Sequence, residues 1–264
     1  MAIEFKVNID DTYINVIKFG KGSKNVLLLP GIFLTGFEKM GDTLESIYNL
    51  FTNDFTFYFM DERKSFNVNE YSIKEMADDI YYVCKELKLN CVYIYGISIG
   101  AMIGQCLAFK YPKFVKKLAI CSSMCKTTKT MYDTAIRWIE IASNNDVVSL
   151  NRDFNTTVCS NEYYEKFKDA FIANETKGTN KDCERFIILC KSLLDFNIEN
   201  EMKNIECDVI AIGDINDKVI SIEGTKEIIN ILKCENKIFD KYSHAVYDEC
   251  EDVKTIIYNF FIKD

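Results

Sequence analysis

The 264-residue chain has only one imidazole that could act as a general base, because it contains a single histidine, His244. It also has no apolar run approaching the roughly 20 residues that a spanning helix needs. The N-terminal residues lack the basic start and apolar core of a secretory signal. We therefore expect a cytoplasmic protein that does not insert into a membrane.

The sequence also lacks the closely spaced pairs of cysteine and histidine that bind metal ions. None of the eleven cysteines forms a CxxC pair, and the nearest approach is Cys121 with Cys125. Zinc sites usually need cysteine and histidine at close, paired spacings, so we expect no metal. The net charge is -8, whereas a surface that binds a nucleic-acid backbone normally has clustered Lys and Arg. We therefore expect no nucleic-acid partner. Cysteines in apolar runs, such as Cys106 and Cys190, are typical of buried thiols in a reducing compartment.

What the chain does contain is an alternation of short apolar runs and helical patterns. Residues 3–9 and 13–19 alternate in part between apolar and polar residues, which predicts an antiparallel hairpin. Later runs predict strands buried on both faces, at residues 26–29, 55–60, 92–95, 118–121 and 209–212. A further short strand is expected at 237–239.

Helices are expected between these strands. Apolar residues recur every three or four positions over 73–87, and Ser72 stands three places before Glu75 as an N-cap. Further helices are predicted at 99–110, 222–232 and 246–262. Alternating strands and helices imply an α/β fold with a mainly parallel central sheet flanked by helices.

The alternation stops between residues 124 and 200. Apolar residues there have helical spacing and no strand is evident. This pattern predicts a helical insertion, with residues 1–123 and 201–264 forming the rest of the domain.

A serine lies at the junction of a predicted strand and helix. Ser98 is flanked by Gly96 and Gly100 in a Gly-x-Ser-x-Gly segment. Glycines at these positions allow a sharp turn that exposes the hydroxyl above the sheet edge, as in a nucleophile elbow. The alternative is that Ser98 only caps the following helix.

The chain resembles the α/β-hydrolase family over nearly its whole length. The segments that carry the resemblance are, in the family's order, 27–32 for the strand and oxyanion loop, 60–63 for the Asp-x-Arg turn, 96–100 for the elbow, 209–217 for the acid strand and turn, and 243–245 for the histidine loop. The resemblance implies an α/β-hydrolase fold in which the insertion at 124–200 is a helical cap.

The resemblance also implies site residues. Ser98 would be the nucleophile, His244 the base and Asp217 the acid that orients it. Asp214 is the alternative acid, although the sequence after Asp217 is more similar to the family's acid turn. The main-chain N–H groups of Ile32 and Ile99 would form the oxyanion hole.

These residues predict a serine hydrolase of a small carboxylic ester, lactone or thioester, acting through an acyl-serine intermediate with no cofactor. Phe33, Met124, Met131 and Trp138 are the candidate substrate-binding residues, with core packing as the alternative for each. C–C bond hydrolysis, acyl transfer and cofactor-free perhydrolysis use the same triad and stay open. A non-catalytic ligand-binding or regulatory protein on the same fold is the alternative outside catalysis. The oligomeric state does not follow from the sequence.

Overall fold

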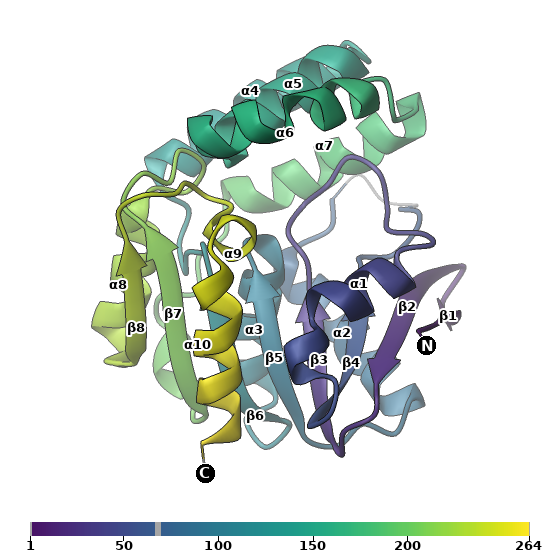
Figure 1. The fold of residues 1–264 in the computed structure, drawn as a ribbon. Coiled ribbons are helices and arrows are strands. Elements are labelled where there is room, and N and C mark those ends of the chain that lie inside the picture. The colour runs from purple at the N-terminus through teal and green to yellow at the C-terminus, as the bar shows by residue number, and fades with distance from the viewer. Residues whose placement is uncertain (1, 67–69, 264) are drawn as a thin grey trace.

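A computed structural model describes residues 2–66 and 70–263 of the chain, and these residues form an eight-stranded sheet (Figure 1). Its strands are β1 (Ile3–Ile9), β2 (Thr12–Gly20), β3 (Lys24–Leu29), β4 (Phe55–Met60), β5 (Val92–Ile97), β6 (Val115–Cys121), β7 (Asp208–Asp214) and β8 (Glu235–Phe239). They lie in the order β1-β2-β4-β3-β5-β6-β7-β8. The hairpin β1–β2 pairs antiparallel with itself and with β4, and the other neighbours are parallel.

Helices cover both faces of this sheet, which explains why every residue of β4 and of β5 is buried. Figure 1 shows α1 (Gly41–Ile47) and α10 (Glu251–Ile262) in front of the sheet, and α2 (Ile73–Glu86), α3 (Ile99–Lys110) and α8 (Ile222–Leu232) behind it. The remaining short elements are α9 (Val246–Glu249) and the 3₁₀ turns at Asn49–Phe51 and Met202–Asn204. The predicted α/β architecture with a mainly parallel sheet is confirmed.

Local sequence signals set several of these elements. Ser72 accepts a hydrogen bond from the Glu75 N–H, and Glu75 accepts one from the Ser72 N–H, which completes the predicted capping box of α2. At the start of α3, a Cβ on Gly100 would lie 2.2 Å from the Leu29 carbonyl oxygen. Glycine therefore lets α3 begin directly against the end of β3.

Four helices lie between β6 and β7 in the sequence: α4 (Lys129–Ser143), α5 (Val147–Val158), α6 (Asn161–Asn174) and α7 (Asn180–Leu194). Figure 1 shows them as a layer above the carboxyl ends of the parallel strands. A bridge between Lys126 and Asn197 brings the two ends of this segment together. None of the residues of α6 is buried, so α6 is the outermost part of the layer.

One predicted element was wrong, because residues 246–262 form two helices rather than one. Cys250 is extended, with φ −109° and ψ 110°, and separates α9 from α10. Glu251 and Asp252 then occupy the first turn of α10, where negative charge favours a new helix start. The helix α1 was not anticipated from the sequence. Among the described residues, no helix is long and apolar enough to cross a membrane.

Candidate active site

Ser98 lies on the turn between β5 and α3. Its backbone has φ 53° and ψ −118°, a conformation that non-glycine residues rarely adopt. Although Ser98 occupies the N-cap position of α3, its side chain makes no capping hydrogen bond. The Ser98 N–H instead donates to the Cys121 carbonyl (2.9 Å), and the Ser98 carbonyl accepts from Ser123 Oγ (3.0 Å). The hydroxyl therefore does not cap the helix, while the main chain is held in a strained turn.

His244 comes from the loop between β8 and α9, and its ring faces Ser98. His244 Nε2 lies 3.0 Å from Ser98 Oγ, and His244 Nδ1 lies 2.8 Å from Asp217 Oδ2. Ser122 Oγ donates to the His244 carbonyl oxygen at 2.6 Å, which holds the loop from the end of β6. A hydroxyl, an imidazole and a carboxylate are thus linked in a chain of hydrogen bonds, the arrangement that can activate a serine as a nucleophile.

Asp217 follows β7 and is buried. Its Oδ1 accepts hydrogen bonds from the N–H groups of Val219 (2.8 Å) and Ile220 (2.9 Å). Burial alone would raise the pKa of Asp217, but the His244 ring and these two N–H donors outweigh burial and lower that pKa. The carboxylate therefore stays ionised beside the imidazole.

Asp214, the alternative acid, has a different set of partners. Its Oδ1 accepts from the N–H and side-chain amide of Asn216, at 2.8 and 3.0 Å. Its Oδ2 accepts from the N–H groups of Lys241 (3.1 Å) and Tyr242 (2.8 Å). Asp214 thus ties the loop after β7 to the loop that carries His244, and the structure brings Asp217, rather than Asp214, to the imidazole.

The two predicted oxyanion-hole residues, Ile32 and Ile99, lie on segments next to Ser98. Ile32 follows β3, and Ile99 is the first residue of α3, where helix N–H groups have no partner within the helix. A Cβ on Gly31 would lie 3.5 Å from Ser98 Cβ, so this loop runs directly beside the serine. Within residues 2–66 and 70–263, neither N–H has a hydrogen-bond acceptor. Both are available to stabilise an anion that forms beside Ser98.

The serine opens into a cavity of about 10 Å³, which is room for about one water molecule. Beside Ser98 and His244, its lining residues are Gly31, Ile32, Met131, Trp138, Phe154, Val158, Leu193, Val219 and Tyr247. Of the predicted substrate-binding residues, Met131 and Trp138 therefore lie at the site.

The other two predicted substrate-binding residues are not among those that line this cavity. Phe33 is 38% exposed, and its ring packs on Phe37 and Phe154, with centroids 4.9 and 5.9 Å away. Met124 is fully buried, and its carbonyl accepts a hydrogen bond from Gln105 Nε2. Met124 comes only three residues after β6, and a Cβ on Gly224 of α8 would lie 2.9 Å from Met124 Cβ, so Met124 packs against α8.

Sequence reasoning missed several lining residues. Val219 stands two positions after Asp217, so the acid turn itself could have indicated it. Phe154, Val158 and Leu193 lie on α5 and α7, where helical spacing marks a buried face without showing which part faces the serine. No sequence signal pointed to Tyr247.

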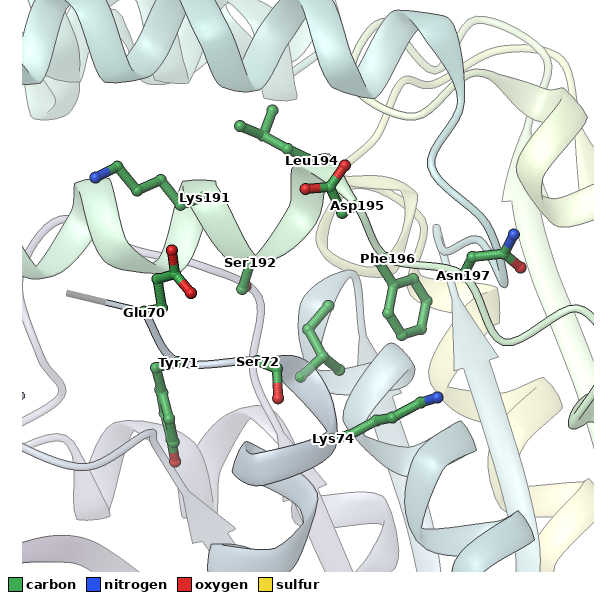
Figure 2. Close-up of a pocket in the computed structure, with 11 residues that line it drawn as sticks. Glu70, Tyr71, Ser72, Lys74, Lys191, Ser192, Leu194, Asp195, Phe196 and Asn197 are labelled. Atoms are coloured by element: carbon green, nitrogen blue, oxygen red, sulfur yellow. The ribbon is translucent and has the colours of Figure 1, made fainter. Parts of the chain in front are cut away.

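A larger cavity of about 570 Å³ lies between the end of α7 and the start of α2 (Figure 2). Figure 2 shows the side chain of Glu70 pointing toward α7 across it, whereas the side chain of Tyr71 points away from α7. Leu194 lines this cavity, whereas its neighbour Leu193 lines the cavity at Ser98. The last turn of α7 therefore separates the two cavities. Among the described residues, no group of three or more His, Cys, Asp and Glu side chains could hold a metal ion.

Comparisons with known proteins identify the fold. A family model described as alpha/beta hydrolase fold matches residues 24–147. Over 50 residues the chain is 38% identical to the "Putative carbamate hydrolase RutD" of Serratia proteamaculans (strain 568), and this match spans 19% of each protein, so it covers about a fifth of that curated relative.

Solved structures resemble the chain over nearly its full length. MGS-M2, an alpha/beta hydrolase enzyme from a Medee basin deep-sea metagenome library, superposes with a TM-score of 0.87 at 19% identity, covering 98% of each chain. The enol-lactonase from Burkholderia xenovorans LB400 gives a TM-score of 0.85 at 14% identity, covering 98% of this chain and all of that one. These likenesses establish the shared fold.

Proposed function

Because this chain has the α/β-hydrolase fold, we propose that it is a serine hydrolase of small carboxylic esters, lactones or thioesters. One observation carries the proposal: His244 Nε2 lies 3.0 Å from Ser98 Oγ while His244 Nδ1 lies 2.8 Å from Asp217 Oδ2. This is the relay that makes a serine hydroxyl nucleophilic. The name of the enol-lactonase, a structural neighbour, fits this substrate class.

The reaction follows from the positions of these groups. His244 Nε2 takes the hydroxyl proton as Ser98 Oγ attacks the substrate carbonyl, and the carbonyl oxygen becomes an oxyanion facing the Ile32 and Ile99 N–H groups. Each such donor is typically worth roughly 3 kcal/mol in the transition state. His244 then gives the proton to the leaving oxygen or sulfur, which departs and leaves an acyl-Ser98 ester.

Deacylation repeats these steps with water. His244 takes a proton from a water molecule, whose oxygen attacks the acyl carbonyl, and the same N–H groups hold the second oxyanion. The proton returns from His244 to Ser98 Oγ, and the carboxylic acid leaves. Asp217 stays ionised throughout and stabilises the imidazolium through Nδ1.

The helices α4–α7 would act as the cap of this enzyme, with residues 124–200 as the cap segment and 1–123 with 201–264 as the core. Met131, Trp138, Phe154 and Leu193 place apolar surface from three of these helices beside Ser98. Such a lining would select apolar acyl groups by size. The buried thiols of Cys106 and Cys190 fit the cytoplasmic location proposed from the sequence.

A direct test is hydrolysis of a p-nitrophenyl ester series from acetate to decanoate, together with labelling by a fluorophosphonate probe. Wild type should hydrolyse at least one ester and take up the probe, and Ser98→Ala should abolish both. Ser143→Ala, which removes an exposed serine at the end of α4, should leave both unchanged. Folded wild type that hydrolyses no ester and takes up no probe would contradict the proposal and favour a binding protein.

A further inference from the structure

A cluster of buried charges joins the helical layer to the sheet. Arg185 on α7 donates from Nη2 to Asp61 Oδ1 (3.1 Å) and to Glu62 Oε2 (2.7 Å). The three side chains are only 9%, 8% and 4% exposed, respectively. Asp61 and Glu62 follow β4 and begin the Asp-x-Arg turn noted in the sequence. The proposed chemistry at Ser98 uses none of these residues.

The arginine of that turn does not neutralise these carboxylates. Arg63 Nε and Nη2 donate to the two oxygens of Asp79 on α2, each at 2.7 Å. The positive charge beside Asp61 and Glu62 is therefore supplied by Arg185, from the helical layer.

Two buried carboxyl groups thus share one guanidinium. Burial and the neighbouring Asp61 charge raise the pKa of Glu62 well above its usual range. Burial would also raise the pKa of Asp61, but Arg185 and hydrogen bonds from Glu62 and the Phe37 N–H outweigh it and lower that pKa. Without Arg185, the ionised Asp61 carboxylate would be buried with no compensating charge.

The same cluster holds the loop that carries the Ile32 N–H. Arg185 Nη1 donates to the carbonyl of Phe33, the next residue, at 3.4 Å. Asp61 accepts from the Phe37 N–H at the other end of this loop, and a Cβ on Gly36 would lie 3.4 Å from Asp61 Oδ2. The loop from 33 to 37 is therefore held at both ends by the charged cluster.

We propose that Arg185 is a positioning residue that, through the Phe33 carbonyl, holds the Ile32 N–H in place against the substrate oxyanion. The oxyanion pocket is then complete only when α7 is seated on the sheet. This inference rests on the proposed function, because the Ile32 N–H has its role only in an acyl-transfer reaction.

Arg185→Met tests the inference through two readouts, which are ester kinetics and hydrogen exchange of the 31–37 backbone amides. We expect kcat to fall about 10- to 100-fold, which is part of the loss seen when an oxyanion donor is removed outright. KM should change less than threefold, and the 31–37 amides should exchange faster. Arg152→Met is the control, because Arg152 makes a two-pronged ion pair with Glu175 within the helical layer and should leave kcat and exchange unchanged.

A triple variant separates positioning from stability. Asp61→Asn, Glu62→Gln and Arg185→Met together remove every charge of the cluster, so no buried charge is left unpaired and folding should recover. The Phe33 carbonyl still lacks its donor, so kcat should stay low. Recovery of kcat together with stability, or a wild-type kcat in a folded Arg185→Met variant, would overturn the inference.

The exchange readout keeps this inference separate from the proposed function. If wild type hydrolyses no ester and takes up no fluorophosphonate, the proposed function fails. The exchange rates still decide whether Arg185 holds the loop. Faster exchange at 31–37 in Arg185→Met alone supports the inference, and unchanged exchange overturns it.

Discussion

The carboxyl edge of the sheet and the layer of helices α4–α7 face each other across the Ser98 cavity, but they are held in place differently. At the sheet edge the constraint is mainly main chain: the Ser98 carbonyl accepts from the Ala101 N–H, and its N–H donates to the Cys121 carbonyl. In the helical layer, side chains such as Met131, Trp138 and Leu193 form the wall of the site.

This difference separates chemistry from selectivity. Main-chain contacts depend little on side-chain identity, so the sheet edge can keep reacting groups in place while surface residues vary. A wall of apolar side chains can be reshaped one residue at a time without moving Ser98. We therefore expect changes at the sheet edge to abolish turnover and changes in the helices to redirect it.

The largest effect is expected at Asp217, on the sheet side of the comparison. Asp217→Asn should lower kcat about 10⁴-fold, because the imidazole loses the carboxylate that orients it and stabilises its charge. Asp214→Asn should retain far more activity but unfold more easily, since Asp214 accepts four hydrogen bonds that join two loops. Ester kinetics and thermal unfolding of both variants check this, and an equal loss of kcat would contradict the assignment of Asp217.

Replacing glycine by alanine should lower the unfolding free energy more at the sheet edge than in the helical layer. A Cβ on Gly100 would lie 2.2 and 2.4 Å from the Leu29 and Pro30 carbonyl oxygens, which are fixed main-chain atoms. Gly100→Ala should therefore cost about 3 kcal/mol or more.

Gly178, in the helical layer, serves as the matched position. It has φ +138°, and a Cβ there would meet the movable end of Leu34 at 2.9 Å. Gly178→Ala should cost about 1 to 2 kcal/mol, chiefly from backbone strain. Urea unfolding measures both free energies, and a larger loss at Gly178 would reverse the comparison.

A substitution at Trp138 tests whether the layer of helices α4–α7 sets the preference for acyl length. Trp138→Leu enlarges the cavity beside Ser98, so kcat/KM for octanoate relative to acetate esters should rise about 10-fold, the scale of a modest change in pocket fit. Ile136→Leu alters an exposed residue of the same helix and should leave the ratio unchanged. A uniform loss on every ester would show that Trp138 does not select acyl length.

The smallest effect concerns acid stability. The pKa of Asp217 is lower in the folded chain than its ordinary value, so its contribution to stability is present above the unfolded value of about 3.9 and is lost as pH falls through the folded value. Below about pH 4, wild type should lose unfolding free energy more steeply than Asp217→Asn. Urea titrations from pH 3 to 6 measure the two slopes, and equal slopes would refute the expectation.

The sequence predicted the limits of some helices and missed the break between others. Helices α3 and α8 begin and end at the predicted residues, and the end of α3 comes just before Pro112, which disfavours helix at the residue before it. Their signals are local. The break at Cys250 was missed because the apolar spacing of α9 and α10 runs through it without a proline or glycine.

Contacts between distant segments were beyond the sequence for a different reason. Arg185 and Asp61 are 124 residues apart, and neither position has a local pattern that names its partner. The directions of Phe33 and Met124 likewise depend on how the helices sit on the sheet. Helical spacing gave a buried face for the insertion, but only the packed structure shows which buried residues reach Ser98.

Because of the backbone conformation of Ser98, selection for stability and selection for turnover should favour different residues at this position. With φ at 53° and ψ at −118°, this residue holds strain of roughly 1 to 3 kcal/mol that a glycine would relieve. A laboratory lineage selected only for thermal resistance would therefore gain from Ser98→Gly, the replacement that removes the proposed nucleophile. Only a population screened for turnover should retain serine at position 98.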